Sequence, residues 1–158
     1  MANSYSQLYI HIVFAVKYRK RLIEDGEKRI ELQKYITGII TNKKQKLYAI
    51  YAMPDHVHIL VSIKPDIAIS DLVRDIKANS SKFINEQNWF PKEFRWQPGF
   101  GAFSHAQSTL DRVINYIKNQ KTHHEKTTFK QEYISLLEQF EIEYKDAYLF
   151  DWGEADGD

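Results

Sequence analysis

Residues 54–63 read PDHVHILVSI, a stretch in which two histidines flank one valine directly after a Pro-Asp pair. Successive side chains of a strand point to opposite faces, so this stretch has two different faces. One face carries only β-branched residues, namely Val57, Ile59, Val61 and Ile63. The other carries His56, His58, Leu60 and Ser62. We predict a strand whose aliphatic face packs against helices and whose second face presents two imidazoles.

Two histidines at positions i and i+2 of a strand share a face, with Cα atoms roughly 6.5–7 Å apart. Both rings can therefore converge on one metal ion. Asp55 precedes them and either orders one imidazole or makes the turn with Pro54. The alternative interpretation is a pair of half-exposed strand histidines without a ligand, so a second motif is needed to complete a site.

The periodicity on either side of this strand predicts three further strands and four helices. Strands are expected at 7–16, 47–52 and 102–105. Helices are expected within 27–40, from a cap at Ser70, from 109 through 126, and after the capping signal at 128–131. This order predicts an α+β fold of the ferredoxin-like (RRM-like) kind, an antiparallel sheet with helices on one face.

The chain has 158 residues, which suits one domain over 1–145 followed by an acidic tail, 146–158, that we expect to be flexible. Cysteine is absent, so a metal ion would be held by His, Asp, Glu or amide oxygen. The sequence has no apolar run of roughly 18 residues, and its N-terminus lacks the layout of a signal peptide. We therefore expect a cytoplasmic protein that does not enter a membrane.

The net charge of +1 conceals a strong asymmetry along the chain. Residues 1–130 carry 21 Lys and Arg against 12 Asp and Glu, whereas residues 131–158 carry one lysine against nine acidic residues. The basic residues gather in two clusters, Lys17, Arg19, Lys20 and Arg21, and Lys43, Lys44 and Lys46. Tyrosine or tryptophan lies near several of them, as on many nucleic-acid-binding surfaces. The alternative is an ordinary solvated, charged surface.

The helix expected from residue 109 is the best candidate for the second motif. At about 100° per residue, Tyr116, Gln120 and His123 align along one flank of its apolar stripe. A tyrosine beside an apolar stripe more commonly belongs to the core or its rim. The pattern of this helix alone leaves both interpretations open.

Three stretches together resemble a known family: DHVHIL at 55–60, WQPGFGAFS at 96–104 and YIKNQKTHH at 116–124. The first looks like the His-hydrophobic-His signature of HUH single-strand endonucleases. The set is similar to the one-tyrosine HUH transposases of small bacterial insertion sequences and their repeat-associated relatives. The likeness covers most of the chain. It departs at His105, where a smaller residue is expected after Ser104, and it assigns no role to His11.

The resemblance implies that His56 and His58 are metal ligands, Gln120 the third ligand and Tyr116 the nucleophile. The implied ion is Mg²⁺ or Mn²⁺. Attack by the tyrosine would leave a 5′-phosphotyrosine and a free 3′-OH. Because that linkage preserves the energy of the phosphodiester, another 3′-OH can reverse the attack and join a new strand.

The implied partners are single-stranded DNA hairpins and a second copy of the chain. In such a homodimer Tyr116 of one subunit often completes the histidine pair of the other. The two basic clusters would contact hairpin phosphates, with binding that weakens as salt is added.

Three other functions compete with this one. A histidine-triad nucleotide hydrolase needs a further histidine at position 60, which is leucine. A non-catalytic regulator would keep the DNA surface without the chemistry. A metal-binding or structural protein is the third alternative.

Overall fold

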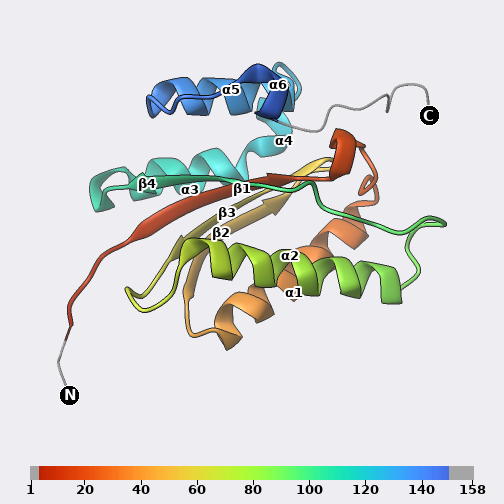
Figure 1. Ribbon diagram of the computed structural model, residues 1–158, viewed down its shortest axis with the longest axis horizontal. Coiled ribbons are helices and arrows are strands. Elements are labelled where there is room, and N and C mark those ends of the chain that lie inside the picture. Colours follow the sequence, from red (N-terminus) through yellow and green to blue (C-terminus); the bar gives the residue numbers. More distant parts are fainter. Residues whose placement is uncertain (1–3, 150–158) are drawn as a thin grey trace.

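The computed structural model describes residues 4–149, without the side chains of 147 and 148. Its sheet contains β1 (Tyr9–Ala15), β2 (Lys46–Ala52), β3 (His56–Ser62) and β4 (Gly101–His105). The helices are η1 (Lys17–Arg19), α1 (Gly26–Asn42), α2 (Ile69–Glu86), η2 (Gln107–Thr109), α3 (Leu110–Lys118), α4 (Gln120–His123), α5 (Phe129–Gln139) and α6 (Asp146–Leu149). All four predicted strands are present, and Figure 1 shows helices above and below them.

The strands form one sheet in the order β2-β3-β1-β4, and every neighbouring pair is antiparallel. The α+β antiparallel fold is therefore confirmed. The first six main elements follow the order β-α-β-β-α-β, which is that of ferredoxin-like folds. The register of β1 and β3 sets Val13 opposite His58 and Ala15 opposite His56. The histidine strand thus lies inside the sheet, between β2 and β1.

Helices α1 and α2 cover the aliphatic face of β3, as predicted. The contact is predominantly apolar and buries the following side chains: Ile12, Phe14, Val57, Ile59, Val61, Leu32, Ile36, Ile40, Leu72, Val73 and Ile76. Burying side chains of this size stabilises a fold by roughly 1.5–3 kcal/mol each. This layer anchors β1 and β3 from one side.

The later helices add a second layer on the opposite face, beyond the one covered face that the sequence predicted. Helix α3 packs through Val113 and Ile117 on Ala49 and Leu60. Helix α5 packs on the other half of the same face, with its side chains Phe129, Tyr133 and Leu137 against Val13, Ala15 and Phe103. The face that carries the histidines is therefore covered on both sides of them.

Two local predictions were wrong. Residue 70 does not cap α2: the N-cap is Ala68, and it makes no side-chain capping bond. The helix expected over 109–126 breaks at Asn119, whose φ of −99° and ψ of 19° separate α3 from α4. The capping box at Thr128 is confirmed, because its side chain accepts from the Gln131 N–H and the Gln131 side chain accepts from the Thr128 N–H.

The predicted acidic tail, 146–158, falls mostly outside the described residues. Its first four residues form α6. Within residues 4–149, no helix has both the length and the apolar character needed to cross a membrane.

Gly101 allows β4 and α5 to approach closely. A Cβ placed there would lie 2.8 Å from Tyr133 Cε1 and 2.9 Å from its hydroxyl oxygen. We expect Gly101→Ala to lower the free energy of unfolding by about 1–3 kcal/mol, the usual cost of overpacking. Urea denaturation measures this effect.

Gly38 provides the matched control, because it is exposed in α1 and a Cβ there would meet nothing within 4 Å. Gly38→Ala should raise stability by about 0.5–1 kcal/mol, since alanine is the better helix former. Equal effects of the two substitutions would contradict the close approach at Gly101.

Candidate active site

The second face of the sheet brings three histidines together. His56 and His58 of β3 are fully buried, and His11 of β1 is 1% exposed. His11 Nε2 lies 2.8 Å from His58 Nδ1, and the two rings stack with centroids 5.0 Å apart. Both predicted imidazoles therefore lie side by side on one face, and a third, from the neighbouring strand, supports His58.

Asp55 holds the other imidazole of the pair. Its Oδ1 lies 2.6 Å from His56 Nδ1, so Nε2 of the same ring is left to face the site. A carboxylate on the far nitrogen fixes the tautomer and orientation of a histidine. Of the two roles open to Asp55, ordering the ring is the one the structure supports.

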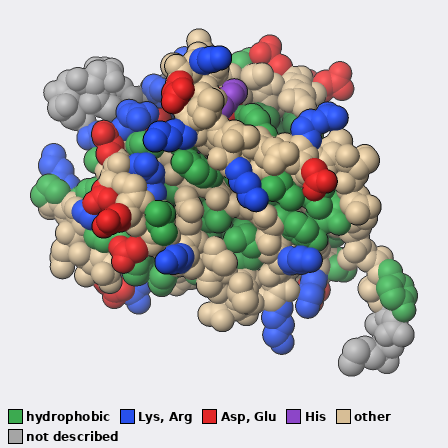
Figure 2. All heavy atoms as spheres, turned by 180° about the vertical axis from the view of Figure 1, so that it is seen from behind, with side chains coloured by type: hydrophobic (Ala, Val, Ile, Leu, Met, Phe, Trp, Pro, Cys, Tyr) green, Lys and Arg blue, Asp and Glu red, His purple; other side chains and the backbone are tan. Residues whose placement is uncertain are grey.

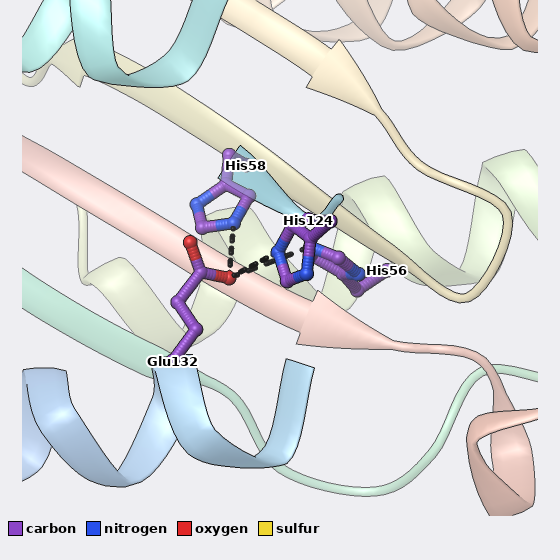
Figure 3. A group of neighbouring side chains, drawn as sticks. All are labelled: His56, His58, His124 and Glu132. Carbon is purple, nitrogen blue, oxygen red and sulfur yellow. Dashed lines mark hydrogen bonds and ion pairs between the residues drawn. The ribbon is translucent and has the colours of Figure 1, made fainter. Parts of the chain in front are cut away.

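Glu132 is the central residue of the site, and the sequence analysis did not identify it. It lies in the first turns of α5, is 2% exposed, and points at β3 (Figure 3). Its Oε1 is 3.1 Å from His58 Nε2, 2.9 Å from His124 Nε2 and 3.6 Å from His56 Nε2. One ligand atom from each of these four residues lies within 4.8 Å of all the others.

The buried carboxylate and the imidazoles shift one another's acidity. Burial alone would raise the pKa of Glu132, but attraction to His58 and the other imidazoles outweighs it and holds that pKa well below its usual value. Burial lowers the pKa of His58, although Glu132 opposes the shift. Burial also acts to lower the pKa of His124, yet its bond to Glu132 leaves that pKa raised. Glu132 therefore stays ionised in a buried position.

Tyr116 and Gln120 reach the same carboxylate from α3 and α4. The Tyr116 hydroxyl donates to Glu132 Oε2, and Gln120 Nε2 donates to the same oxygen at 2.8 Å. Gln120 Oε1 lies 3.4 Å from His56 Nε2, and the Tyr116 ring lies edge-on to His58 at 5.8 Å. The break at Asn119 does not separate the pair, and the structure brings all four predicted site residues together within one chain.

Burial, with Glu132 beside it, raises the pKa of the Tyr116 hydroxyl far above its usual value. A carboxylate next to a phenol penalises the phenolate, because two like charges would then share one buried site. In the described state, Tyr116 is therefore a neutral hydrogen-bond donor.

The sequence held only a weak signal for Glu132. The capping box at Thr128 places Glu132 near the start of a helix, where an acidic side chain is favourable in any case. The same helical face carries Phe129, Tyr133 and Leu136. A carboxylate on an otherwise apolar helix face was the available clue.

The two basic clusters lie at opposite ends of β3. Lys17, Arg19, Lys20 and Arg21 follow β1 beside His56, since the Val16 N–H donates to Asp55 O at 2.9 Å. Lys46 pairs with Ser62 at the other end of β3, about 20 Å away along the strand. Lys43, next to Lys44, forms an ion pair with Asp75. On the face drawn in Figure 2, basic side chains are interspersed with acidic and hydrophobic ones.

The sequence model of a transposase family described as IS200-like matches residues 4–120, about three quarters of the chain. The chain belongs to the IS200-like transposase family. This transposase is similar to the ISDra2 transposase TnpA of Deinococcus radiodurans, at 28% identity over 121 residues. That match covers 72% of this chain and 84% of the relative. It is also similar to the transposase for insertion sequence element IS200 of Salmonella typhimurium, at 29% identity over 116 residues, 70% of this chain and 74% of the relative.

Two solved structures resemble the fold of this transposase. One is a crystal structure of a candidate transposase from Deinococcus radiodurans, with a TM-score of 0.61 and 26% identity over 76% of this chain and 95% of that one. The other is a REP-associated tyrosine transposase bound to a REP hairpin, with a TM-score of 0.58 and 17% identity over 78% and 73%. Because the second structure shares only 17% of its sequence with this chain, the likeness shows a shared fold and nothing more.

Removing the charge of Glu132 should destabilise this transposase when no metal ion is present. We expect Glu132→Gln, in the presence of a chelator, to lower the free energy of unfolding by about 1.5–3 kcal/mol, because hydrogen bonds to a charged group are lost. The folded-state pKa of Glu132 lies below its usual 4.5, so the difference from wild type is present at neutral pH. It should narrow as the pH falls below about 4.5, where the unfolded chain takes up the proton first.

Glu138→Gln is the matched control, since Glu138 is exposed on the same helix. It should leave the free energy of unfolding within about 0.5 kcal/mol of wild type. Chemical denaturation over a range of pH measures both variants. Equal stability of the Glu132 variant and wild type at neutral pH would show that the carboxylate does not hold the site together.

Proposed function

We propose that this transposase binds single-stranded DNA hairpins and cuts and rejoins strands through a 5′-phosphotyrosine on Tyr116, with Mg²⁺ or Mn²⁺ as cofactor. The observation that carries the proposal is the convergence of Tyr116, Gln120 and the His56–His58 pair on one buried carboxylate. A phenol, two imidazoles and an amide are the groups that the resemblance to HUH transposases requires. Membership of the IS200-like family supports the same reaction class.

In the proposed step, the Tyr116 oxygen forms a bond to phosphorus and the bond from phosphorus to the 3′ oxygen breaks. The phenol proton is relayed by Glu132 Oε2, which already accepts the hydroxyl hydrogen bond, to the departing 3′ oxygen, so that Glu132 is ionised again when the step ends. Another 3′-OH reverses this attack and joins its own strand to the phosphate.

The donor set of the site fits a divalent ion. His56 and His58 would supply imidazole nitrogens, Gln120 its Oε1 and Glu132 a carboxylate oxygen, all within a few ångströms of one another. Oxygen donors suit Mg²⁺ and Mn²⁺, and the imidazoles favour the later transition metals. When bound, such an ion polarises the phosphate and offsets its charge. Asp55 and His11 hold the two ligand rings in orientation.

A hairpin would lie against the basic residues beside the site. Of the predicted contacts, Lys17, Arg19, Lys20 and Arg21 are near His56, whereas Lys43, Lys44 and Lys46 would contact DNA at a distance from the cut. The hairpin in the REP-associated transposase structure supports this class of partner. We further propose a homodimer, because strand exchange needs two cleavage sites close together. A shared active site, with Tyr116 supplied by the partner, stays a prediction.

Substitution of Tyr116 tests the nucleophile. The protein is incubated with 5′-labelled and 3′-labelled hairpin oligonucleotides copied from the DNA flanking its gene, and the products are separated on a denaturing gel. Wild type should yield an adduct carrying the 3′-labelled fragment, and Tyr116→Phe should yield none while binding the hairpin within a few-fold of wild type. Tyr144→Phe, at an exposed tyrosine, should react as wild type does.

An adduct retained in Tyr116→Phe would move the nucleophile to another tyrosine. Hairpin binding by wild type without any adduct, given correct flanking sequence, would favour the non-catalytic regulator.

Removal of a ligand tests the metal requirement. Adduct formation should need added Mg²⁺ or Mn²⁺ and stop with a chelator. It should fall by at least about 100-fold in His58→Ala, because losing a residue that merely supports a metal ligand already costs about 10–100-fold. Circular dichroism checks that the variant is folded. Unchanged adduct yield in the chelator would refute the assignment of His56, His58 and Gln120 as ligands.

A further inference from the structure

A cavity of about 400 Å³ opens next to Tyr116, between α3, α5 and the end of β4. Its walls include Tyr116 and Glu132, so it is continuous with the catalytic carboxylate. The volume lies within the usual range of small-ligand sites, about 300–1,000 Å³. A strand that presents a phosphate to Tyr116 must carry its neighbouring nucleotides past this opening.

One side of the cavity is cationic or hydrogen-bonding. Arg112 of α3 lies at its rim and is exposed, and no carboxylate among residues 4–149 pairs with it. Nε2 of His105 and Nε2 of His123 are both buried and without a hydrogen-bond partner in the described part of the chain. His123 Nε2 is 3.5 Å from Glu132 Oε2, and among the described residues Glu132 is the one acidic residue that lines the cavity. The remaining groups suit an anion.

The other side of the cavity is apolar. Val113, Leu136 and Phe140 form it, and the Phe140 ring lies 5.4 Å from that of His105 in an edge-on arrangement. An aromatic ring at the wall of a cationic cavity is the usual means of holding an unpaired base, which stacks without regard to its sequence. A phosphate alone would need no such wall.

We infer that this cavity binds one unpaired nucleotide adjacent to the cleaved phosphate, with Arg112 on its own phosphate and its base against Phe140. The inference rests on the proposed function, since it assumes that DNA reaches Tyr116. It assigns a role to His105, which departs from the family pattern: with His123, it offers an unpaired ring nitrogen to the nucleotide. Arg112 and Phe140 are thus positioning residues for the strand.

Neutralising one phosphate at a time tests the contact with Arg112. Hairpin oligonucleotides copied from the DNA flanking the gene carry a single methylphosphonate at successive positions of the unpaired strand, and fluorescence anisotropy at low salt measures their binding. One position next to the cut should weaken binding by wild type about fivefold. Arg112→Ala should bind the unmodified oligonucleotide about fivefold more weakly and show no further loss at that position.

Lys118→Ala is the matched control, because Lys118 is an exposed cation on the same helix outside the cavity lining. Its binding should be weakened by the methylphosphonate as much as the binding of wild type is. The assignment of Arg112 to that phosphate is overturned if a methylphosphonate weakens binding by Arg112→Ala as much as binding by wild type at every position. It is also overturned if the methylphosphonate no longer weakens binding by either variant.

Removing one base at a time tests the apolar wall. An abasic nucleotide at the same position should weaken binding by wild type about tenfold, and the penalty should largely disappear in Phe140→Leu, which keeps the volume apolar but removes the ring. A penalty of equal size in both proteins would exclude stacking on Phe140. Circular dichroism checks that the Phe140 variant is folded. If it is unfolded, the methylphosphonate comparison between wild type and Arg112→Ala decides whether the cavity binds a nucleotide.

The binding experiments and the adduct assay separate the two proposals. Coupling between Arg112 and one phosphate without any adduct would leave the subsite in place and refute the cleavage chemistry. An adduct without coupling would refute the subsite and leave the chemistry in place. No binding of any flanking oligonucleotide would refute both.

Discussion

Strand β3 is buried on both faces, and this constraint organises the rest of the molecule. A strand in the interior of a sheet normally reads as a continuous apolar run when helices cover both faces. Here the face toward α1 and α2 is wholly aliphatic, but the opposite face begins with His56 and His58. Buried imidazoles need partners, so the second helical layer has to supply polar groups as well as apolar cover.

The second layer meets that need with one carboxylate. Glu132 satisfies polar groups from β3, α3, α4 and the segment before α5, and the apolar contacts of α3 and α5 lie on either side of it. An ionised carboxylate in this position costs several kcal/mol in desolvation, which its hydrogen bonds and the attraction of the imidazoles offset. The same arrangement keeps Tyr116 protonated until the electrostatics of the site change. The local stability of the site and the neutral state of Tyr116 therefore both depend on one side chain.

The sequence was informative wherever a pattern repeats locally. Alternation and the turn residues that flank it predicted all four strands, and alternation also predicted the side of β3 on which His56 and His58 lie. The capping box at Thr128 predicted the start of α5. The family resemblance predicted that Tyr116 and Gln120 would join the histidines, which the helical pattern alone left open.

What the sequence did not reveal depends on contacts between distant segments. His58 and Glu132 are 74 residues apart, and no local pattern relates them. The break at Asn119 lies in a stretch whose residues all tolerate a helix, so tertiary contacts outweigh local propensity there. Ser70 has the chemistry of a cap, yet α2 begins one residue before it, at Ile69.

The strand order also determines the order in which the sheet and the site form while the chain is being synthesised. Strand β1 emerges first, but its two neighbours in the sheet are β3 and β4, so the centre of the sheet closes only after residue 105 has left the ribosome. The histidine strand is paired by then, whereas the helices with Tyr116 and Glu132 are still to come. A nascent chain thus holds a folded sheet before it holds a complete site. Because Tyr116 and Glu132 both follow the last strand in the sequence, the site is completed only after the sheet that supports it.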